Sequence, residues 1–250
     1  MKKVVFVALY IFLSFSVLAD SAEQLIKKAN DFYAKKQYDS ALLVYLQVLD
    51  QGLEAPELYY NIGNVYFRKG EIAKAILFYE RAYRLDPTND KIKYNLDFAN
   101  QFVQDKFEQV PEFFLKRWWH TLALLLSANV WAIVSLIFFL LLLISIYIFL
   151  FAKQLIYRKI AFSLGFVFLL ISVFAFSFAK TNYSYYTKSN EAIIMYTSSV
   201  RSSPSDDGTE LYILHQGVKV KVISISDGWY EVRLPNGSIG WIKREKLEKI

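Results

Sequence analysis

The chain of 250 residues is 55% hydrophobic and has a mean hydropathy of +0.25, which is too apolar for an ordinary soluble protein. Its formal net charge is +6, but the excess cations stand at Lys2, Lys3 and beside the longest apolar runs. Cations in those places meet lipid headgroups, so a nucleic-acid-binding surface is not expected. The chain contains no cysteine, which excludes disulfides, thiol nucleophiles and thiolate metal sites.

The N-terminal segment is typical of an export signal. Lys2 and Lys3 precede an apolar stretch over residues 4–18, and Ala19 closes it before the first acidic residue. We therefore expect a signal peptide over residues 1–19 that is cleaved after Ala19. An uncleaved anchor helix is the alternative, although the stretch is shorter than the ~20 residues that a spanning helix needs. In both cases the segment that follows is exported.

Two copies of a 34-residue helical pattern follow. Gly63 and Ala75 lack bulk and let two helices cross closely, while aromatic residues fill the space around that contact. The matching positions are Leu25, Ala29, Phe32, Ala41, Tyr45 and Val48 in the first copy, and Tyr59, Ile62, Gly63, Tyr66, Ala75, Tyr79, Ala82 and Pro87 in the second. The pattern resembles a tetratricopeptide (TPR) array, a family that usually holds a peptide or helix of another protein. A further helix over residues 90–104 is expected to bury the open edge of the array, which then covers residues 22–110.

The concave face of this array is the candidate binding site. In the TPR family fixed positions of each inner helix point into the groove, and here they place Ile26, Asn30, Tyr33, Tyr60, Asn64, Phe67, Tyr94 and Phe98 there. Asparagine amides can bond both the N–H and the C=O of a peptide. TPR domains that bind an acidic C-terminus add lysines where this chain has Ile26 and Tyr94, so a partly apolar helix or peptide is expected instead. The alternative is that both asparagines are only solvated helix residues.

Residues 113–126 mix aromatic side chains with cations. Trp118 and Trp119 follow directly after Lys116 and Arg117. Aromatic rings and cations together are typical of a helix that lies at the membrane surface. We therefore expect an interfacial helix over residues 113–126.

Two apolar runs long enough to cross a bilayer come next. Ser127 is a suitable N-cap for a first transmembrane helix over residues 128–152, and a second is expected over residues 160–179. The loop 153–159 between them carries three cations, which indicates a cytoplasmic location. Neither run contains Asp, Glu, Lys, Arg or His, so transport is not expected and the hairpin is an anchor. Both soluble domains then lie outside the cytoplasm.

From residue 191 onward the apolar pattern alternates with period 2. Five short strands are expected over residues 193–196, 211–214, 218–224, 230–234 and 238–243, with a hairpin signal at Asn236-Gly237. Four blocks resemble the bacterial SH3-like family: Val200-Arg201-Ser202-Ser203-Pro204, Leu214-His215-Gln216-Gly217, Gly228-Trp229-Tyr230-Glu231-Val232 and Asn236-Gly237-Ser238-Ile239-Gly240-Trp241-Ile242. The resemblance implies a small SH3-like β-barrel over residues 188–250. The predicted fold class is thus a multidomain membrane protein with TPR helices, a two-helix hairpin and an all-β SH3-like barrel.

Trp229, Tyr230 and Trp241 are candidates for an aromatic ligand groove on this barrel, and aromatic packing across the strands explains them as well. The two histidines, His120 and His215, stand apart from any nucleophile or metal-ligand spacing. Phosphate-loop and dinucleotide fingerprints are missing from the sequence. Neither catalysis nor a cofactor or metal is therefore expected.

The order of signal peptide, TPR repeats, membrane hairpin and SH3-like domain resembles the BatE-like proteins of bacterial aerotolerance (Bat) operons. The resemblance implies a non-enzymatic scaffold of the bacterial inner membrane, with periplasmic domains and a role in stress tolerance. The implied partners are membrane-anchored von Willebrand factor A-domain proteins, other Bat-type membrane proteins and, indirectly, a MoxR-type AAA+ ATPase. The alternative is a wall tether, because bacterial SH3-like domains often recognise peptidoglycan.

Overall fold

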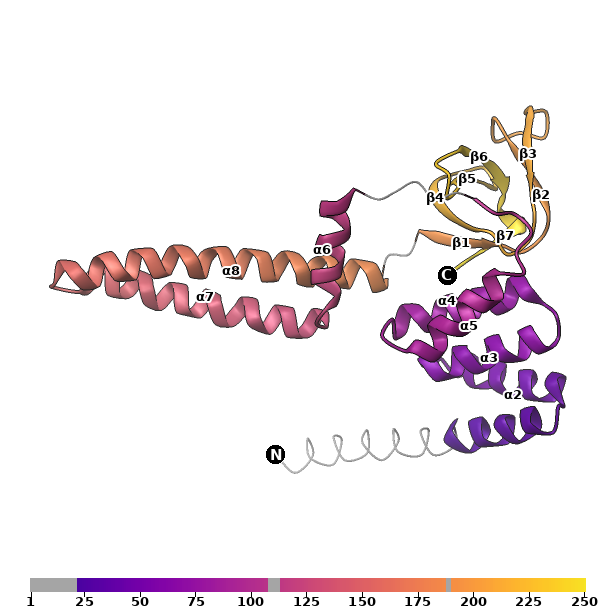
Figure 1. The fold of residues 1–250 in the computed structure, drawn as a ribbon, viewed down its shortest axis with the longest axis horizontal. Coiled ribbons are helices and arrows are strands. Elements are labelled where there is room, and N and C mark those ends of the chain that lie inside the picture. Colours follow the sequence, from indigo (N-terminus) through magenta and orange to yellow (C-terminus); the bar gives the residue numbers. More distant parts are fainter. Residues whose placement is uncertain (1–21, 108–112, 188–189) are drawn as a thin grey trace, which may run out of the picture. The chain divides into compact units, whose positions relative to one another are not determined.

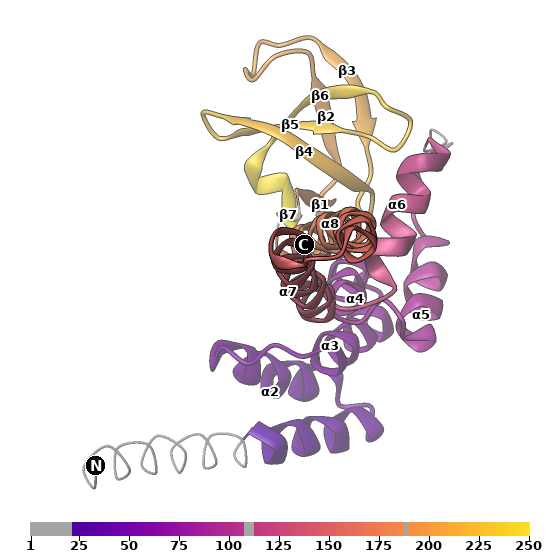
Figure 2. The same cartoon turned by 90° about the vertical axis from the view of Figure 1, so that its left-hand side faces the viewer.

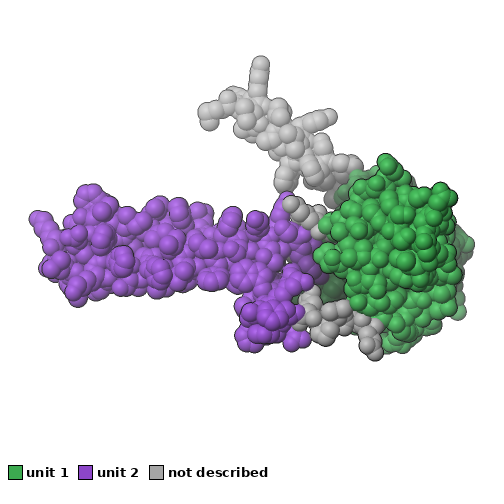
Figure 3. All heavy atoms as spheres, turned by 90° about the horizontal axis from the view of Figure 1, so that it is seen from above, with its two compact units in different colours: residues 1–109, 190–250 green, residues 110–189 purple. Residues whose placement is uncertain are grey.

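The structure, a computed structural model, describes residues 22–107, 113–187 and 190–250 (Figure 1). These residues belong to two compact units, one formed by residues 1–109 with 190–250 and the other by residues 110–189 (Figure 3). The expected signal peptide over residues 1–19 lies outside the described residues.

The N-terminal part of the first unit is an array of antiparallel helices. Residues 22–34 are helical, and α2 (Tyr38–Asp50), α3 (Pro56–Arg68), α4 (Ile72–Leu85) and α5 (Asp90–Asn100) follow. Pro56 occupies the first turn of α3, where its missing N–H costs no hydrogen bond. Gly52 and Gly70 follow α2 and α3 with φ of +77° and +78°, the left-handed conformation that ends many helices.

The second helix pair crosses at the position that the repeat pattern predicts. A Cβ atom added to Gly63 would lie 2.6 Å from two ring carbons of Tyr79, so only glycine allows α3 and α4 to approach this closely. Tyr79 and Ile62 are almost fully buried beside it. The equivalent residue of the first repeat is Ala29, which is also fully buried.

The array stops at α5 because the outer face of α5 offers no apolar surface on which a further helix could pack. The positions by which α3 packs on α4 are polar and exposed in α5, where Lys93, Asp97 and Asn100 replace Tyr59, Gly63 and Tyr66. Figure 1 shows the β strands on the far side of α4 and α5 from the first repeat. The end of the array is therefore closed by α5 together with the β domain.

Polar contacts join α4 to the C-terminal strands. The Arg81 guanidinium donates to Glu248 Oε1 and to the Lys249 carbonyl oxygen, both at 2.9 Å. Arg84 donates to the Ile250 carbonyl oxygen at 2.7 Å. The buried carboxylate of Glu80 lies 2.9 Å from the Lys219 ammonium. These contacts link residues more than a hundred positions apart in the chain.

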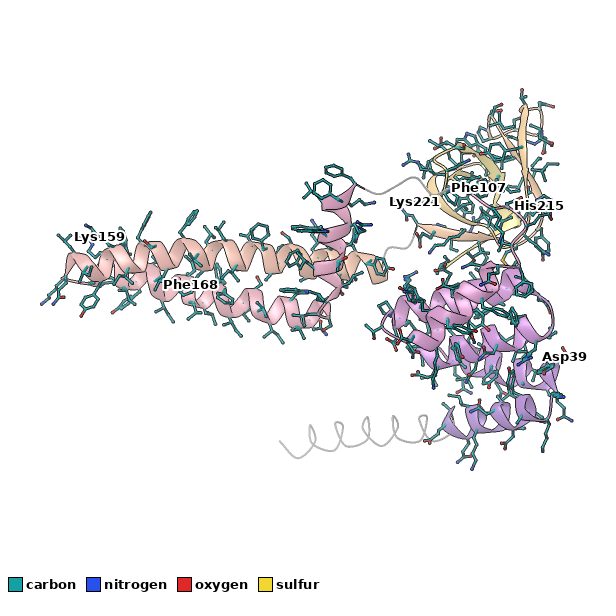
Figure 4. The ribbon with its side chains drawn as sticks, viewed as in Figure 1. Asp39, Phe107, Lys159, Phe168, His215 and Lys221 are labelled. Carbon is teal, nitrogen blue, oxygen red and sulfur yellow. The ribbon has the colours of Figure 1, made fainter. Side chains whose placement is uncertain are left out.

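The chain after α5 also packs on the β domain. Asp105 accepts a hydrogen bond from the backbone N–H of His215 at 2.7 Å, and its carboxylate lies 2.8 Å from the His215 ring. His215 is labelled in Figure 4. A Cβ atom at Gly217 would lie 3.0 Å from Val103 and 3.4 Å from Ile76, so the two domains approach closely there. One continuous apolar core therefore runs through both domains.

The β domain is a seven-stranded antiparallel sheet with strand order β3-β2-β6-β5-β4-β1-β7. The strands are β1 (Glu191–Ile194), β2 (Ser198–Arg201), β3 (Glu210–Leu214), β4 (Lys219–Ser226), β5 (Trp229–Arg233), β6 (Ile239–Lys243) and β7 (Leu247–Lys249). A 3₁₀ turn over Arg244–Lys246 precedes β7. Two strands exceed the five expected from sequence, because β2 and β7 each have one buried residue and hence no detectable alternation.

The tightest hairpin turn differs from the one that the sequence favours. Asp227 and Gly228, with φ of +39° and +82°, form a two-residue connection between β4 and β5. Asn236 and Gly237 also lie in a hairpin, but a longer one, in which the Leu234 N–H donates to the Ser238 carbonyl oxygen at 2.9 Å. Both dipeptides allow left-handed backbone, so composition alone does not distinguish the two turns.

The second unit contains α6 (Phe114–Leu124), α7 (Ala128–Phe151) and α8 (Leu155–Thr187). α7 and α8 form an antiparallel hairpin and are long and apolar enough to cross a membrane (Figures 1 and 2). Only 6% of the most apolar window of α7 is buried, so its side chains face outward, as in contact with lipid. A soluble core helix would bury these side chains, so the exposure supports association with a membrane.

α8 is longer than its apolar run at both ends. It begins at Leu155 and takes in Arg158 and Lys159, so only residues 152–154 separate it from α7. It also continues past Ala179 to Thr187. A helix satisfies its own backbone hydrogen bonds in lipid and in the headgroup region alike, so its ends need not coincide with the ends of the apolar run.

Candidate functional site

Asn30, in the first repeat, accepts two hydrogen bonds on its side-chain oxygen. The Tyr45 hydroxyl donates to Asn30 Oδ1 at 2.5 Å. The amide of Asn61 donates to the same oxygen at 3.4 Å. The residues come from three successive elements, the first helix, α2 and α3, so the contact joins one repeat to the next.

The same arrangement recurs 34 residues later. The Tyr79 hydroxyl donates to Asn64 Oδ1 at 2.7 Å, and the amide of Asn95 donates to the same oxygen at 2.9 Å. Asn95 also donates to the Tyr60 hydroxyl at 2.9 Å. We call these two sets the Asn–Tyr–Asn triads: Asn30, Tyr45 and Asn61, then Asn64, Tyr79 and Asn95.

The tyrosines of the triads are held in their protonated, donating form. Burial raises the pKa of Tyr45 to about 12, and it raises the pKa of Tyr79 further. Each hydroxyl therefore donates its hydrogen bond to the Oδ1 atom of its asparagine. Within the described residues, the amide nitrogens of Asn30 and Asn64 have no hydrogen-bond acceptor, so each keeps its two donors.

These donors border an open hollow. It has a volume of about 310 Å³ and is lined by Asn30, Tyr33, Tyr45, Asn61 and Asn64. Three of these, Asn30, Tyr33 and Asn64, are among the residues that the sequence placed in the groove. The lining presents amide and phenol groups and no formal charge, which suits the uncharged polar groups of a peptide backbone.

Aromatic rings cover the array beyond the hollow. Phe67 lies 5.5 Å from Phe98 and 5.6 Å from Phe102, measured between ring centroids, and Tyr94 lies 6.4 Å from Phe98. Tyr94 is 70% exposed and Phe102 56%, although both are large aromatic side chains. We call Phe67, Tyr94, Phe98 and Phe102 the aromatic strip. Exposed apolar side chains that touch one another are typical of an interaction surface.

The structure distributes the predicted groove residues over three environments. Asn30, Tyr33 and Asn64 line the hollow, and Phe67, Tyr94 and Phe98 form most of the aromatic strip. Tyr60 packs between them, with its ring 5.9 Å from that of Tyr79. Ile26 packs against the core instead.

Sequence reasoning missed Asn61, Asn95 and Phe102. The two asparagines recur at the repeat period of 34, and that recurrence could have identified them. Phe102 is equivalent to Ala34 and Arg68 of the two repeats, so no aromatic residue recurs at its position.

A second hollow lies on the β domain. It has a volume of about 560 Å³ and is lined by Asp206, Asp227, Gly228, Trp229, Lys243, Arg244 and Glu245. The Lys243 ammonium lies 2.7 Å from the Asp206 carboxylate and 5.4 Å from the centre of the Trp229 ring. The hydrogen bond from Lys243 lowers the pKa of Asp206, so this ion pair persists in mildly acidic solution.

The three aromatic candidates of the β domain separate in the structure. Trp229 lines the hollow but is largely covered, with 8% exposure. Tyr230 is buried in the domain core. Trp241 is half-buried and pairs with Arg201 and Glu231 on neighbouring strands. Sheet packing therefore accounts for Tyr230 and Trp241.

The described residues contain no group of three or more acidic or histidine side chains that could hold a metal ion. His215 is bound to Asp105 at the junction of the two domains, which is a structural contact. The expectation of no cofactor stays a prediction.

The fold and its two hollows define a membrane-associated protein with a helical repeat array and a small antiparallel β domain. Residues 26–90 match the family model described as tetratricopeptide repeat, and residues 197–248 match the model described as bacterial SH3 domain. These matches confirm the predicted fold class. No curated protein matches the chain. The matches identify domains, and the likeness of the whole chain to BatE-like proteins stays a prediction.

Proposed function

We propose that this protein is a non-enzymatic, membrane-anchored adaptor that binds a segment of a partner protein on the concave face of its TPR array. The observation that carries the proposal is the pairing of two donor-bearing asparagines, Asn30 and Asn64, with the exposed aromatic strip. TPR domains act in protein–protein interaction, which agrees with this surface.

The chemistry of the face defines the ligand. The amide nitrogens of Asn30 and Asn64 are suited to backbone carbonyl oxygens or to polar side chains of the ligand. The aromatic strip is suited to one or two apolar side chains of the same segment. The ligand is therefore a short, partly apolar peptide or helix. Binding in one such groove tends to be micromolar, about 8 kcal/mol, so confinement to the membrane would raise the effective concentration of the partner.

The location and partners follow from the likeness to BatE-like proteins. We place the anchor in the bacterial inner membrane and both soluble domains in the periplasm. A bacterial SH3 domain and two apolar helices support this placement. The proposed partners are membrane-anchored von Willebrand factor A-domain proteins and other Bat-type membrane proteins, with a MoxR-type AAA+ ATPase acting indirectly. The proposed role is assembly of an envelope complex for stress tolerance.

Photo-crosslinking in living cells tests the adaptor. A benzoylphenylalanine replaces Tyr94, which is 70% exposed on the aromatic strip, or Leu43, which is 68% exposed on α2 and serves as the matched control. Mass spectrometry of the adducts is expected to find A-domain membrane proteins at position 94 and not at position 43. Equal labelling at both positions, or none at position 94, would contradict the proposal.

A wall tether is the second candidate, favoured by the open hollow around Trp229 and by the match to bacterial SH3 domains. In this reading the full-length protein sediments with purified peptidoglycan sacculi. Arg244→Glu, which changes the lining of the hollow, abolishes sedimentation, whereas Arg233→Glu on the exposed sheet surface does not. Equal sedimentation of both variants would remove the hollow as the binding site.

A further inference from the structure

The short helix α6 runs across the end of the membrane hairpin. In Figure 1 α6 is drawn nearly perpendicular to α7 and α8, and Figure 2, which looks along the hairpin, shows the same crossing. Residues 125–127 turn the chain between α6 and α7. If the hairpin crosses a bilayer, α6 lies parallel to the membrane surface.

Polar side chains fix this crossing. Asn182 of α8 is 2% exposed, and its amide donates to the carbonyl oxygens of Ala123 at 3.1 Å and Leu126 at 3.0 Å. One carbonyl belongs to the last turn of α6 and the other to the turn that follows, where no further turn of helix satisfies them. The Trp131 indole also donates to the Ala123 oxygen at 3.1 Å. Side-chain hydrogen bonds from Asn182 and Trp131 therefore fix the angle between α6 and the hairpin.

One side of α6 packs on α8. The Trp119 indole donates to the Thr181 hydroxyl at 3.1 Å, and the Trp119 ring lies 4.7 Å from that of Phe178. Ala123, one turn further along the helix, is fully buried. This contact leaves two free flanks on α6.

The two free flanks differ in chemistry. At 100° per residue, one flank carries Phe114, Leu115, Trp118 and Leu122, which are 54%, 55%, 66% and 44% exposed. The opposite flank carries Arg117 and His120. A helix that was covered by water on both flanks would leave a continuous apolar strip uncovered. A membrane surface accommodates both flanks, since acyl chains and headgroups meet there.

Two cations are exposed near this helix. Arg117 is exposed on α6 itself, and the exposed Lys180 precedes Thr181, whose hydroxyl accepts the hydrogen bond of the Trp119 indole. The anion available at that depth in a bilayer is the phosphate of a lipid headgroup.

We propose that α6 is an in-plane membrane helix that inserts Phe114, Leu115, Trp118 and Leu122 among acyl chains and binds anionic phospholipid headgroups through Arg117. The locked angle makes the anchor L-shaped, with two upright helices and one flat helix. A flat helix resists tilting of the hairpin in the bilayer.

Spin-label depth measurements test the insertion, and the absence of native cysteine makes each label unique. Leu122→Cys and His120→Cys lie about 160° apart around the helix and so on opposite flanks. Each is labelled in the full chain and reconstituted in vesicles of phosphatidylglycerol and phosphatidylcholine. The label at position 122 is expected to collide several-fold more often with oxygen, and that at position 120 with a water-soluble nickel complex. Equal accessibility to nickel at both positions would overturn the insertion.

A lipid-selectivity experiment tests the headgroup contact separately. Spin-labelled phosphatidylglycerol is expected to associate with the wild-type protein at least twofold more than spin-labelled phosphatidylcholine. Arg117→Gln should reduce this preference, whereas Lys27→Gln, at an exposed cation of the helical array, should leave it unchanged. An unchanged preference in the α6 variant would show that Arg117 does not bind lipid.

Discussion

At the scale of single residues, the packing of Gly63 against Tyr79 decides whether the second repeat can form. The hydrogen atom of glycine leaves room for a ring that any side chain would strike. The same tyrosine then reaches Asn64 with its hydroxyl, so one side chain fixes both the helix crossing and the polar face of the groove. Packing and binding are therefore coupled at adjacent positions in the chain.

We predict that Gly63→Ala destabilises the array. The new Cβ atom would lie 2.6 Å from the Tyr79 ring, so α3 and α4 must separate, at a cost of about 1–3 kcal/mol typical of overpacking. Thermal unfolding followed by circular dichroism should give a lower midpoint. Ser40→Ala, at an exposed position of α2, is the control. A midpoint as high as that of the control would contradict the tight crossing.

Two substitutions of Asn64 separate its structural role from its binding role. Asn64→Asp keeps an oxygen for Tyr79 and Asn95 but loses the amide donors, so the fold should persist while partner capture falls. Asn64→Leu removes the oxygen and leaves the buried Tyr79 hydroxyl without an acceptor, at a cost of about 1–3 kcal/mol. Unfolding midpoints together with crosslinking yields from position 94 check both. Full capture by Asn64→Asp would show that its amide does not contact the partner.

At the scale of elements, sequence patterns predicted where helices and strands lie better than where they end or how they cross. The repeat of small and aromatic residues predicted the α3–α4 pair because each position has a packing role. The apolar run predicted the central part of α8 but not its ends. Arg158 and Lys159 belong to the helix although they are charged, so the end of the apolar run does not mark the end of the helix. The angle of α6 depends on Asn182, which is distant in sequence, so no local pattern contains it.

The candidate site follows the same division. Asn30 and Asn64 were predictable because the groove positions recur with the repeat. The aromatic strip was predictable in part, because the positions equivalent to Phe102 in the two repeats hold Ala34 and Arg68 and show no aromatic pattern. The packing of α4 on the β domain was not predictable, since it depends on single long-range contacts such as that between Arg81 and Glu248. Pairing between distant residues leaves no periodic trace in one sequence.

We predict that Asn182→Leu loosens α6 without disturbing the hairpin. The substitution removes two hydrogen bonds; it leaves the Leu126 carbonyl oxygen without its donor and leaves the Ala123 oxygen with the Trp131 indole alone. Hydrogen exchange of the α6 amides should accelerate, while exchange in α7 and α8 stays slow. Asn129→Leu, exposed near the start of α7, is the control. Unchanged exchange in α6 would mean that other contacts hold it.

At the scale of the whole molecule, the array and the β domain of the first unit share one core and a partly buried ion pair. Burial raises the pKa of Glu80 in spite of the Lys219 ammonium, so the folded protein binds a proton there more readily than the unfolded chain. This group's contribution to stability is therefore largest at low pH and declines as pH rises through its folded pKa. Lys219 and the nearby Glu191 carboxylate, 2.9 Å from its ammonium, belong to the same cluster.

We predict that Lys219→Met destabilises the first unit in a pH-dependent manner. The variant leaves Glu80 buried without a cation, at a cost of about 2 kcal/mol, less than for a fully buried pair because the Lys219 side chain is 37% exposed. The pKa of Glu80 should rise further, so the loss should shrink as pH falls from 7.5 to 5. Urea unfolding at both values measures it. A loss that is independent of pH would exclude Glu80 as its cause.

The position of the hairpin within the chain has a consequence for the order of synthesis. The helical array is complete by residue 107, and the β domain that closes its open end begins only at residue 190. At about 5–20 residues per second, translation of the intervening segment takes on the order of ten seconds. During that interval the β domain does not yet cover Ile76 and Val103, and the β domain of a neighbouring chain can pack on them instead. Timing on the ribosome thus makes this edge the point most vulnerable to exchange between copies.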